Sequence, residues 1–141
     1  MRLEFIIEEG YVDIKSKHKK YELLCRQLSH LFYIESIDEV LSVLIQNNEP
    51  YWEQGYNSTY LNINSNRVRI ADSVNFNNID KNLDAKEDDN IKINKVSGNM
   101  TGYIDIEKNL FKRILMEWKN FILKKDNKSF ACGYHRKILD I

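Results

Sequence analysis

The spacing of apolar residues divides the chain into expected strands and helices. Leu3, Phe5 and Ile7 alternate with other side chains, which predicts a strand with one buried face that ends near Gly10. Apolar residues then recur at intervals of three and four, as on one face of an α-helix. The members of this stripe are Tyr21, Leu24, Cys25, Leu28, Leu31 and Phe32.

A second helix is expected directly after the first. Ser36 and Glu39 have the spacing of a capping box, in which each side chain hydrogen-bonds the other residue's free amide. Asn47 and Asn48 suit the end of this helix, and Pro50 prevents its continuation. Its expected buried face consists of Ile37, Val40, Leu41 and Leu44.

Strands are expected in the middle of the chain. Alternating apolar residues predict a hairpin over residues 58–71, with residues 64–66 in the left-handed geometry that hairpin turns use. Two further strands are expected at Ile91–Val96 and Met100–Ile104, and residues 98–99 supply the turn between them.

The clearest helical pattern comes last. Asp105 suits the N-cap of this helix and Glu107 its first turn, while Lys124 and Lys125 complement the helix dipole at the other end. Residues 129–141 form either a final strand or a loosely held tail. The apolar stripe of the helix consists of Leu110, Phe111, Ile114, Leu115, Trp118, Phe121 and Ile122.

These elements predict one α+β domain in a chain of 141 residues. We expect an antiparallel sheet of about four to five strands, with two N-terminal helices and a long C-terminal helix. Two stretches lack periodicity, and they are Glu49–Asn57 and Asp72–Asn90.

Composition bears on the location of the protein. The chain has 21 basic and 21 acidic residues, which removes any whole-chain electrostatic argument for nucleic acid or a membrane. Neither a signal peptide nor an apolar run of about 18 residues is present. We therefore expect a cytoplasmic protein, with Cys25 as a buried thiol and no disulfide bridge to Cys132.

Residues that carry catalytic or metal chemistry are sparse. The histidines are His18, His30 and His135, and only Cys132 and His135 have a ligand-like spacing. Two ligands do not make a zinc site. The chain also lacks a glycine-rich phosphate loop and a Gly-x-Ser-x-Gly nucleophile motif. No catalytic site, metal or cofactor is expected, and an enzyme is the least favoured class.

Aromatic residues gather in the first non-periodic stretch and at the strand after it. They are Tyr51, Trp52, Tyr56 and Tyr60. One interpretation is that Trp52 packs over a sheet edge and anchors a loop. The other is a recognition surface, because Trp and Tyr dominate binding hot spots. The sequence leaves both interpretations open.

Charge is unevenly distributed, with a net charge of −7 over residues 34–91 and +6 over residues 92–141. The acidic excess forms either a solvated loop that faces the basic C-terminal helix or a docking surface for a basic partner. The candidate acidic residues are Asp72, Asp80, Asp84, Glu87, Asp88 and Asp89.

The basic side of the last helix gives a weaker alternative. Nucleic acid could bind there, although basic residues on a helix are usually only a solvated face, so direct nucleic-acid binding is not the prediction. These residues are Lys108, Lys112, Arg113, Lys119, Lys124 and Lys125.

The region from Trp52 to Ile122 resembles bacterial immunity proteins of polymorphic toxin systems, such as those of contact-dependent growth inhibition. The resemblance rests on the aromatic-Gly-aromatic-Asn entry to a hairpin at residues 52–57, the hairpin end at residues 68–72, and a closing helix with the form Phe-x-x-x-Leu-x-x-Trp. It carries no toxin-contact residue over to this chain. The helix positions are Phe111, Leu115 and Trp118.

The resemblance implies a small cytoplasmic inhibitor that binds a cognate toxin domain and blocks its active site. Many such toxins are nucleases with basic clefts, and the acidic middle of this chain is compatible with occupying one. The alternative is another protein-binding inhibitor or adaptor module, for example one encoded by a phage.

Overall fold

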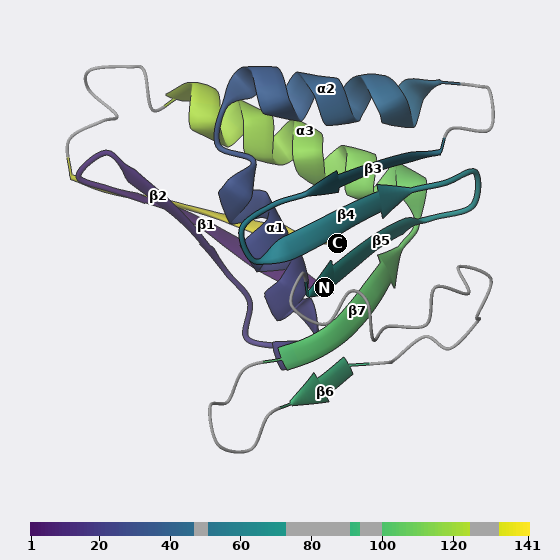
Figure 1. The fold of residues 1–141 in the computed structure, drawn as a ribbon. Coiled ribbons are helices and arrows are strands. Elements are labelled where there is room, and N and C mark those ends of the chain that lie inside the picture. Colours follow the sequence, from purple (N-terminus) through teal and green to yellow (C-terminus); the bar gives the residue numbers. More distant parts are fainter. Residues whose placement is uncertain (47–50, 73–90, 94–99, 125–132) are drawn as a thin grey trace.

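The computed structural model describes residues 1–46, 51–72, 91–93, 100–124 and 133–141 (Figure 1). Two antiparallel sheets and three α-helices surround one core. The α+β class, the single domain and an antiparallel sheet of about five strands are therefore confirmed, and the second, smaller sheet was not predicted. Local periodicity identifies strands but does not say which strands pair. The sequence therefore does not separate the strands of one sheet from those of the other.

The smaller sheet combines both ends of the chain. It contains β1 (Arg2–Glu8), β2 (Tyr11–Lys15) and β8 (Tyr134–Asp140) in the order β2-β1-β8. The three alternating apolar residues of the predicted first strand are fully buried. β2 was not predicted because Ile14 is its one buried residue. Of the two possibilities for the end of the chain, the structure shows the strand.

The larger sheet has the order β3-β4-β5-β7-β6. The predicted hairpin and the strand at Met100–Ile104 are confirmed, and β6 covers the first part of the strand predicted at Ile91–Val96. β3 lies in a stretch that showed no periodicity. The strands are β3 (Trp52–Gly55), β4 (Thr59–Ile63), β5 (Val68–Asp72), β6 (Ile91–Ile93) and β7 (Met100–Ile106).

The turn between β4 and β5 differs from the predicted left-handed turn. Among the described residues, Glu9 is the only one besides glycines with a positive φ. The Asn64 side chain makes the turn instead, because its Oδ1 accepts hydrogen bonds from the amides of Asn66 at 2.8 Å and Arg67 at 3.0 Å. An asparagine side chain can thus replace a left-handed backbone in a tight connection.

The helices link the two sheets. A 3-10 turn (Lys19–Tyr21) leads into α1 (Glu22–His30), which contacts β2 of the smaller sheet and β4, β5 and β7 of the larger one. α2 (Ile34–Ile45) and α3 (Lys108–Lys124) run alongside each other (Figure 1). The predicted apolar faces of all three helices are buried, apart from Tyr21, Phe32 and Leu110 at their ends.

The predicted helix boundaries need correction in two places. α1 ends at His30, so Phe32 lies beyond the helix and is exposed. α2 begins at Ile34, with no side-chain cap. Ser36 and Glu39 consequently lie inside the helix, and the predicted capping box is wrong. The reason is that α1 ends early enough to leave room for three more residues at the start of α2.

The predicted N-cap of α3 is also wrong. Asp105 belongs to β7, where its carboxylate binds the guanidinium of Arg69 on β5. The helix begins at Lys108, three residues after Asp105, and its first turn is closed by the amide of Phe111 donating to the carbonyl of Glu107 at 2.9 Å. A charged partner in the neighbouring strand has overridden a local capping preference.

Trp118 lies at the centre of the core, as its position in the helical stripe predicted. Its side chain is fully buried and makes an edge-to-face contact with Phe5 of β1 at 5.0 Å between ring centroids. Its indole N–H donates to the carbonyl of Leu31 at 2.8 Å. One residue thereby ties α3, the smaller sheet and the end of α1 together.

Candidate functional site

The predicted acidic surface is only partly within the described residues. Asp72 is buried at 7% exposure and lies 3.8 Å from the guanidinium of Arg26 on α1. This environment favours a structural role for Asp72. The other five candidates, Asp80, Asp84, Glu87, Asp88 and Asp89, lie outside the described residues.

Three of the four predicted aromatic residues separate into two anchors and one surface residue. Trp52 is half-buried and packs against the main core. Tyr56 also packs against the core, and its ring stacks on His30 at 6.1 Å between centroids. Tyr51, in contrast, is 63% exposed. The loop-anchor interpretation therefore holds for Trp52 and Tyr56, and Tyr51 remains available to a partner.

His30 takes part in this anchoring contact. Its Nε2 lies 2.8 Å from the hydroxyl of Ser58, just before β4. Burial lowers the pKa of His30, and the nearby Arg26 lowers it further. Burial also raises the pKa of Tyr56 to about 12, with a further contribution from Glu39. Both rings are thus neutral at physiological pH, as suits a structural contact.

A carboxylate held by tyrosines occupies the outer face of the larger sheet, at its β3 edge. The hydroxyl of Tyr51 donates to Oε2 of Glu53 at 2.9 Å. A hydrogen bond from Tyr60 is the largest cause that lowers the pKa of Glu53, and Tyr51 lowers it further. Glu53 is therefore ionised at neutral pH and fixed in orientation. We call Tyr51, Glu53 and Tyr60 the tyrosine-held carboxylate.

Two further strands of the larger sheet, β5 and β7, carry a buried ion pair in line with Glu53. Glu53 is aligned across the sheet with Asn62, Arg69 and Asp105 in successive strands. Arg69 is 3% exposed and makes two hydrogen bonds to Asp105, at 2.7 and 2.8 Å. Its guanidinium also stacks over the ring of Tyr103 at 3.9 Å. Glu53 thus lies at one end of a polar row whose other end is an internal ion pair.

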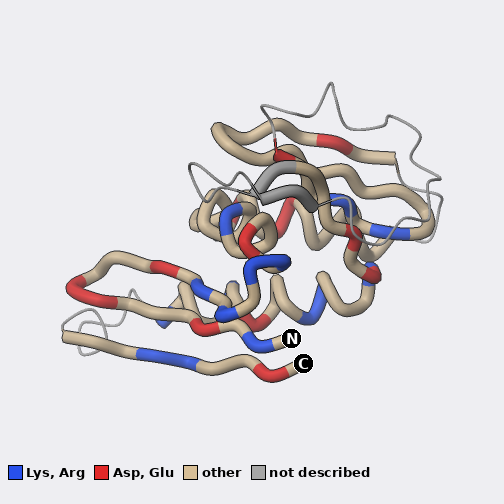
Figure 2. Tube along the Cα trace, turned by 90° about the horizontal axis from the view of Figure 1, so that it is seen from below, with Lys and Arg blue, Asp and Glu red and all other residues tan. Residues whose placement is uncertain are grey.

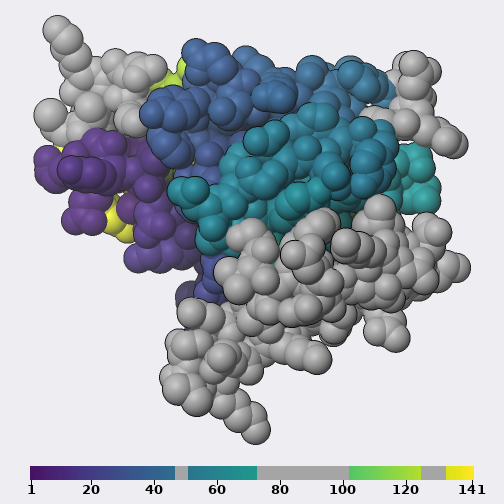
Figure 3. All heavy atoms as spheres, in the orientation of Figure 1, coloured from purple at the N-terminus to yellow at the C-terminus, as the bar shows by residue number. Residues whose placement is uncertain are grey.

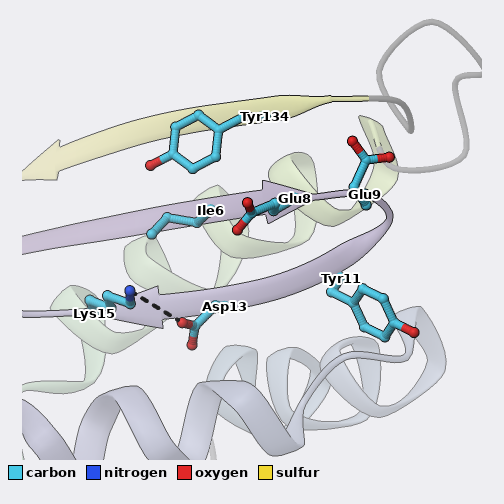
Figure 4. A pocket seen from close by; sticks show the side chains of 7 residues that line it. All are labelled: Ile6, Glu8, Glu9, Tyr11, Asp13, Lys15 and Tyr134. Atoms are coloured by element: carbon cyan, nitrogen blue, oxygen red, sulfur yellow. Dashed lines mark ion pairs between the residues drawn. The ribbon is translucent and has the colours of Figure 1, made fainter.

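A hollow of about 480 Å³ lies on the outer face of the smaller sheet (Figure 4). Tyr134, Glu8 and Tyr11 form one cross-strand row there, because Glu8 pairs with Tyr134 on one side and Tyr11 on the other. Ile6, Glu9 and the Asp13–Lys15 ion pair complete the lining. We call the part formed by Ile6, Glu8, Glu9, Tyr11 and Tyr134 the Tyr11–Tyr134 groove.

The turn at the end of this groove has unusual backbone geometry. Glu9 and Gly10 have φ values of 48° and 82°, as in a two-residue hairpin turn with both central residues left-handed. Asparagine or glycine is favoured at the first of these positions, and another residue there costs about 1 kcal/mol. The amide of Glu9 donates to the carbonyl of Gly133 at 3.0 Å, which joins the turn to the start of β8.

The basic surface predicted on the last helix is reduced in the structure. The ammonium group of Lys119 lies 2.6 Å from the carboxylate of Asp38 on α2, so its charge is already paired. Lys125 lies outside the described residues. Of the basic residues predicted on this face, Lys119 thus has its charge paired within the fold.

Comparisons with protein-family models, curated proteins and solved structures found no match to this chain. Within the described residues, no group of three or more His, Cys, Asp or Glu side chains has the arrangement of a metal site. No helix in the same ranges is long and apolar enough to cross a membrane.

Several of these surface residues were missed by the sequence reasoning. Glu53 received no role because its stretch showed no periodicity, although strand alternation from Tyr51 would have placed both on one face. Tyr11 and Tyr134 are 81% and 55% exposed, and neither belongs to an apolar pattern. Tyr11 and Tyr134 lie beside the carboxylate of Glu8 only because β1 pairs with both β2 and β8.

Proposed function

We propose that this chain is a protein-binding domain, and specifically a cytoplasmic immunity protein that neutralises a cognate toxin domain. The observation that carries the proposal is the tyrosine-held carboxylate. Glu53 is exposed and ionised, and an exposed tyrosine donates to it. Tyrosines of this kind supply large contact area at protein interfaces, and a fixed carboxylate supplies charge complementarity.

The arrangement suits a basic partner for a physical reason. A side chain that is ordered before binding loses less conformational entropy when the complex forms. Glu53 is already ordered by its hydrogen bonds, so it can meet an arginine or lysine of the partner at lower cost. In a nuclease toxin, that basic residue would otherwise face a substrate phosphate, and the bound carboxylate would block the site.

Co-expression with the toxin encoded directly upstream tests the function. Growth rescue by the natural chain supports it, and continued killing overturns it. The surface is then tested by Glu53→Lys, which should weaken affinity for the purified toxin by about thirtyfold, as for loss of a hot spot.

The matched control is Glu35→Lys on α2, which changes the charge equally at an exposed residue. It should change the affinity by no more than about threefold. Equal losses in the two variants, with rescue by the natural chain intact, would remove the tyrosine-held carboxylate from the interface while leaving the function in place.

A further inference from the structure

The Tyr11–Tyr134 groove lies apart from the tyrosine-held carboxylate. The β1–β2 hairpin projects at one side of the molecule, away from β3 and β4 (Figure 3). On its outer face, the Glu8 side chain lies between the strands that carry Tyr11 and Tyr134 (Figure 4). Both tyrosines are exposed, whereas the neighbouring Ile6 is buried and forms an apolar floor.

Most other charges on this face already have partners within the sheet. Among the described residues, however, Glu8 and Glu9 make no ion pair, and the hairpin tip is a run of acidic positions (Figure 2). Within the part of the chain that the structure describes, the groove therefore keeps a negative charge that no side chain of this face pairs with. The satisfied pairs are Arg136 with Glu4 at 2.8 Å, Arg2 with Asp140 at 3.6 Å and Lys15 with Asp13 at 3.8 Å.

We propose that the Tyr11–Tyr134 groove binds an arginine side chain of a protein partner. A guanidinium presents a planar fork of N–H donors that matches a carboxylate, here that of Glu8. Its flat faces and its attraction to aromatic rings suit the flanking tyrosines. The methylene groups of the arginine would lie over Ile6. This inference rests on the proposed protein-binding function for the identity of the partner, but it concerns a second surface.

Arginine is favoured over lysine by the same features. A lysine ammonium is a compact charge that cannot bind a carboxylate with two parallel hydrogen bonds. It also lacks a planar face to stack on Tyr11 or Tyr134. The groove should therefore distinguish two peptides of equal charge, which a merely acidic surface would not do.

The test is a titration of the full chain, followed by the NMR shifts of its backbone amides. The probes are three blocked tripeptides, Gly-X-Gly, in which X is arginine, lysine or citrulline. The arginine peptide should shift the amides of Glu8, Glu9, Tyr11 and Tyr134 saturably in the range of about 10 mM, and bind at least about threefold more tightly than the lysine peptide. Citrulline keeps the shape without the charge and should not saturate.

Variants assign the binding to the groove. Glu8→Gln should weaken the arginine peptide by about fivefold, and Tyr134→Leu by about threefold. Glu35→Gln on α2 is the matched control and should leave the titration unchanged. Equal binding of the arginine and lysine peptides, or equal binding by Glu8→Gln and the natural chain, would overturn the inference.

The outcome separates this inference from the proposed function. If the chain neutralises the toxin but its groove does not bind the arginine peptide, the inference about the groove is overturned and the proposed function stands. If the groove binds the arginine peptide specifically but the chain rescues no cell, the proposed function is overturned and the arginine-binding groove stands.

Discussion

The outer faces of the two sheets use tyrosines and carboxylates in different ways. On the larger sheet, Asp105 is bound by Arg69, which is buried, and Glu53 is held by tyrosine hydroxyls. On the smaller sheet, Glu8 and Glu9 lie beside exposed tyrosines without an ion-pair partner among the described residues. The difference separates a carboxylate that is ordered by its neighbours before any partner arrives from carboxylates whose charge no described residue pairs with.

The largest expected effect comes from breaking the buried pair. Asp105→Ala removes the carboxylate that binds the buried guanidinium of Arg69, and the free energy of unfolding should fall by about 3 kcal/mol. Glu8→Gln changes an exposed carboxylate and should stay within about 0.5 kcal/mol of the natural chain. Urea unfolding of the three proteins measures both values. Similar losses in the two variants would erase the contrast between the faces.

A smaller effect of opposite sign is expected at the hairpin turn. Glu9→Gly relieves the left-handed backbone and should raise the free energy of unfolding by about 0.5–1 kcal/mol. Glu35→Gly, in the first turn of α2, should lower it by a similar amount, because glycine weakens a helix. Urea unfolding again provides the measurement. A loss of stability in Glu9→Gly would show that the turn is not strained.

The smallest expected effect is a pH dependence of the free energy of unfolding, which arises from His30 beside the larger sheet. Burial lowers the pKa of His30 in the folded state, so the unfolded chain binds a proton more readily near pH 6. Stability from this group is present above its unfolded pKa of about 6.5 and is lost as pH falls through the lower folded pKa.

His30→Gln removes this titration and should flatten the decrease in stability between about pH 7 and 5. Thermal unfolding across that range compares the variant with the natural chain. An unchanged pH profile would mean that the imidazole does not discriminate between the folded and unfolded states.

The sequence predicted the parts of the fold that depend on local pattern. The apolar stripe around Trp118 predicted α3, and the alternation of apolar residues over residues 58–71 predicted the hairpin. The smaller sheet could not be predicted in the same way, because β2 and β8 bury only one residue each. Their positions depend on pairing with β1, and β8 lies more than a hundred residues away along the chain.

The candidate site was predicted less well for the same reason. Tyr51 was identified from its residue type, but its partner Glu53 was not. Asp105 resembled a helix cap because nothing near it in the sequence points to Arg69, which reaches it from another strand. Groups that act together across strands become visible only once the register is known.

The central claim is that the tyrosine-held carboxylate contacts the partner. Tyr51→Phe combined with Tyr60→Phe keeps both rings and the carboxylate but removes the two hydroxyls that hold Glu53. The most direct measurement is the affinity of this double variant for the toxin encoded upstream. The account predicts a loss of about tenfold, with the fold retained. An affinity equal to that of the natural chain would contradict it.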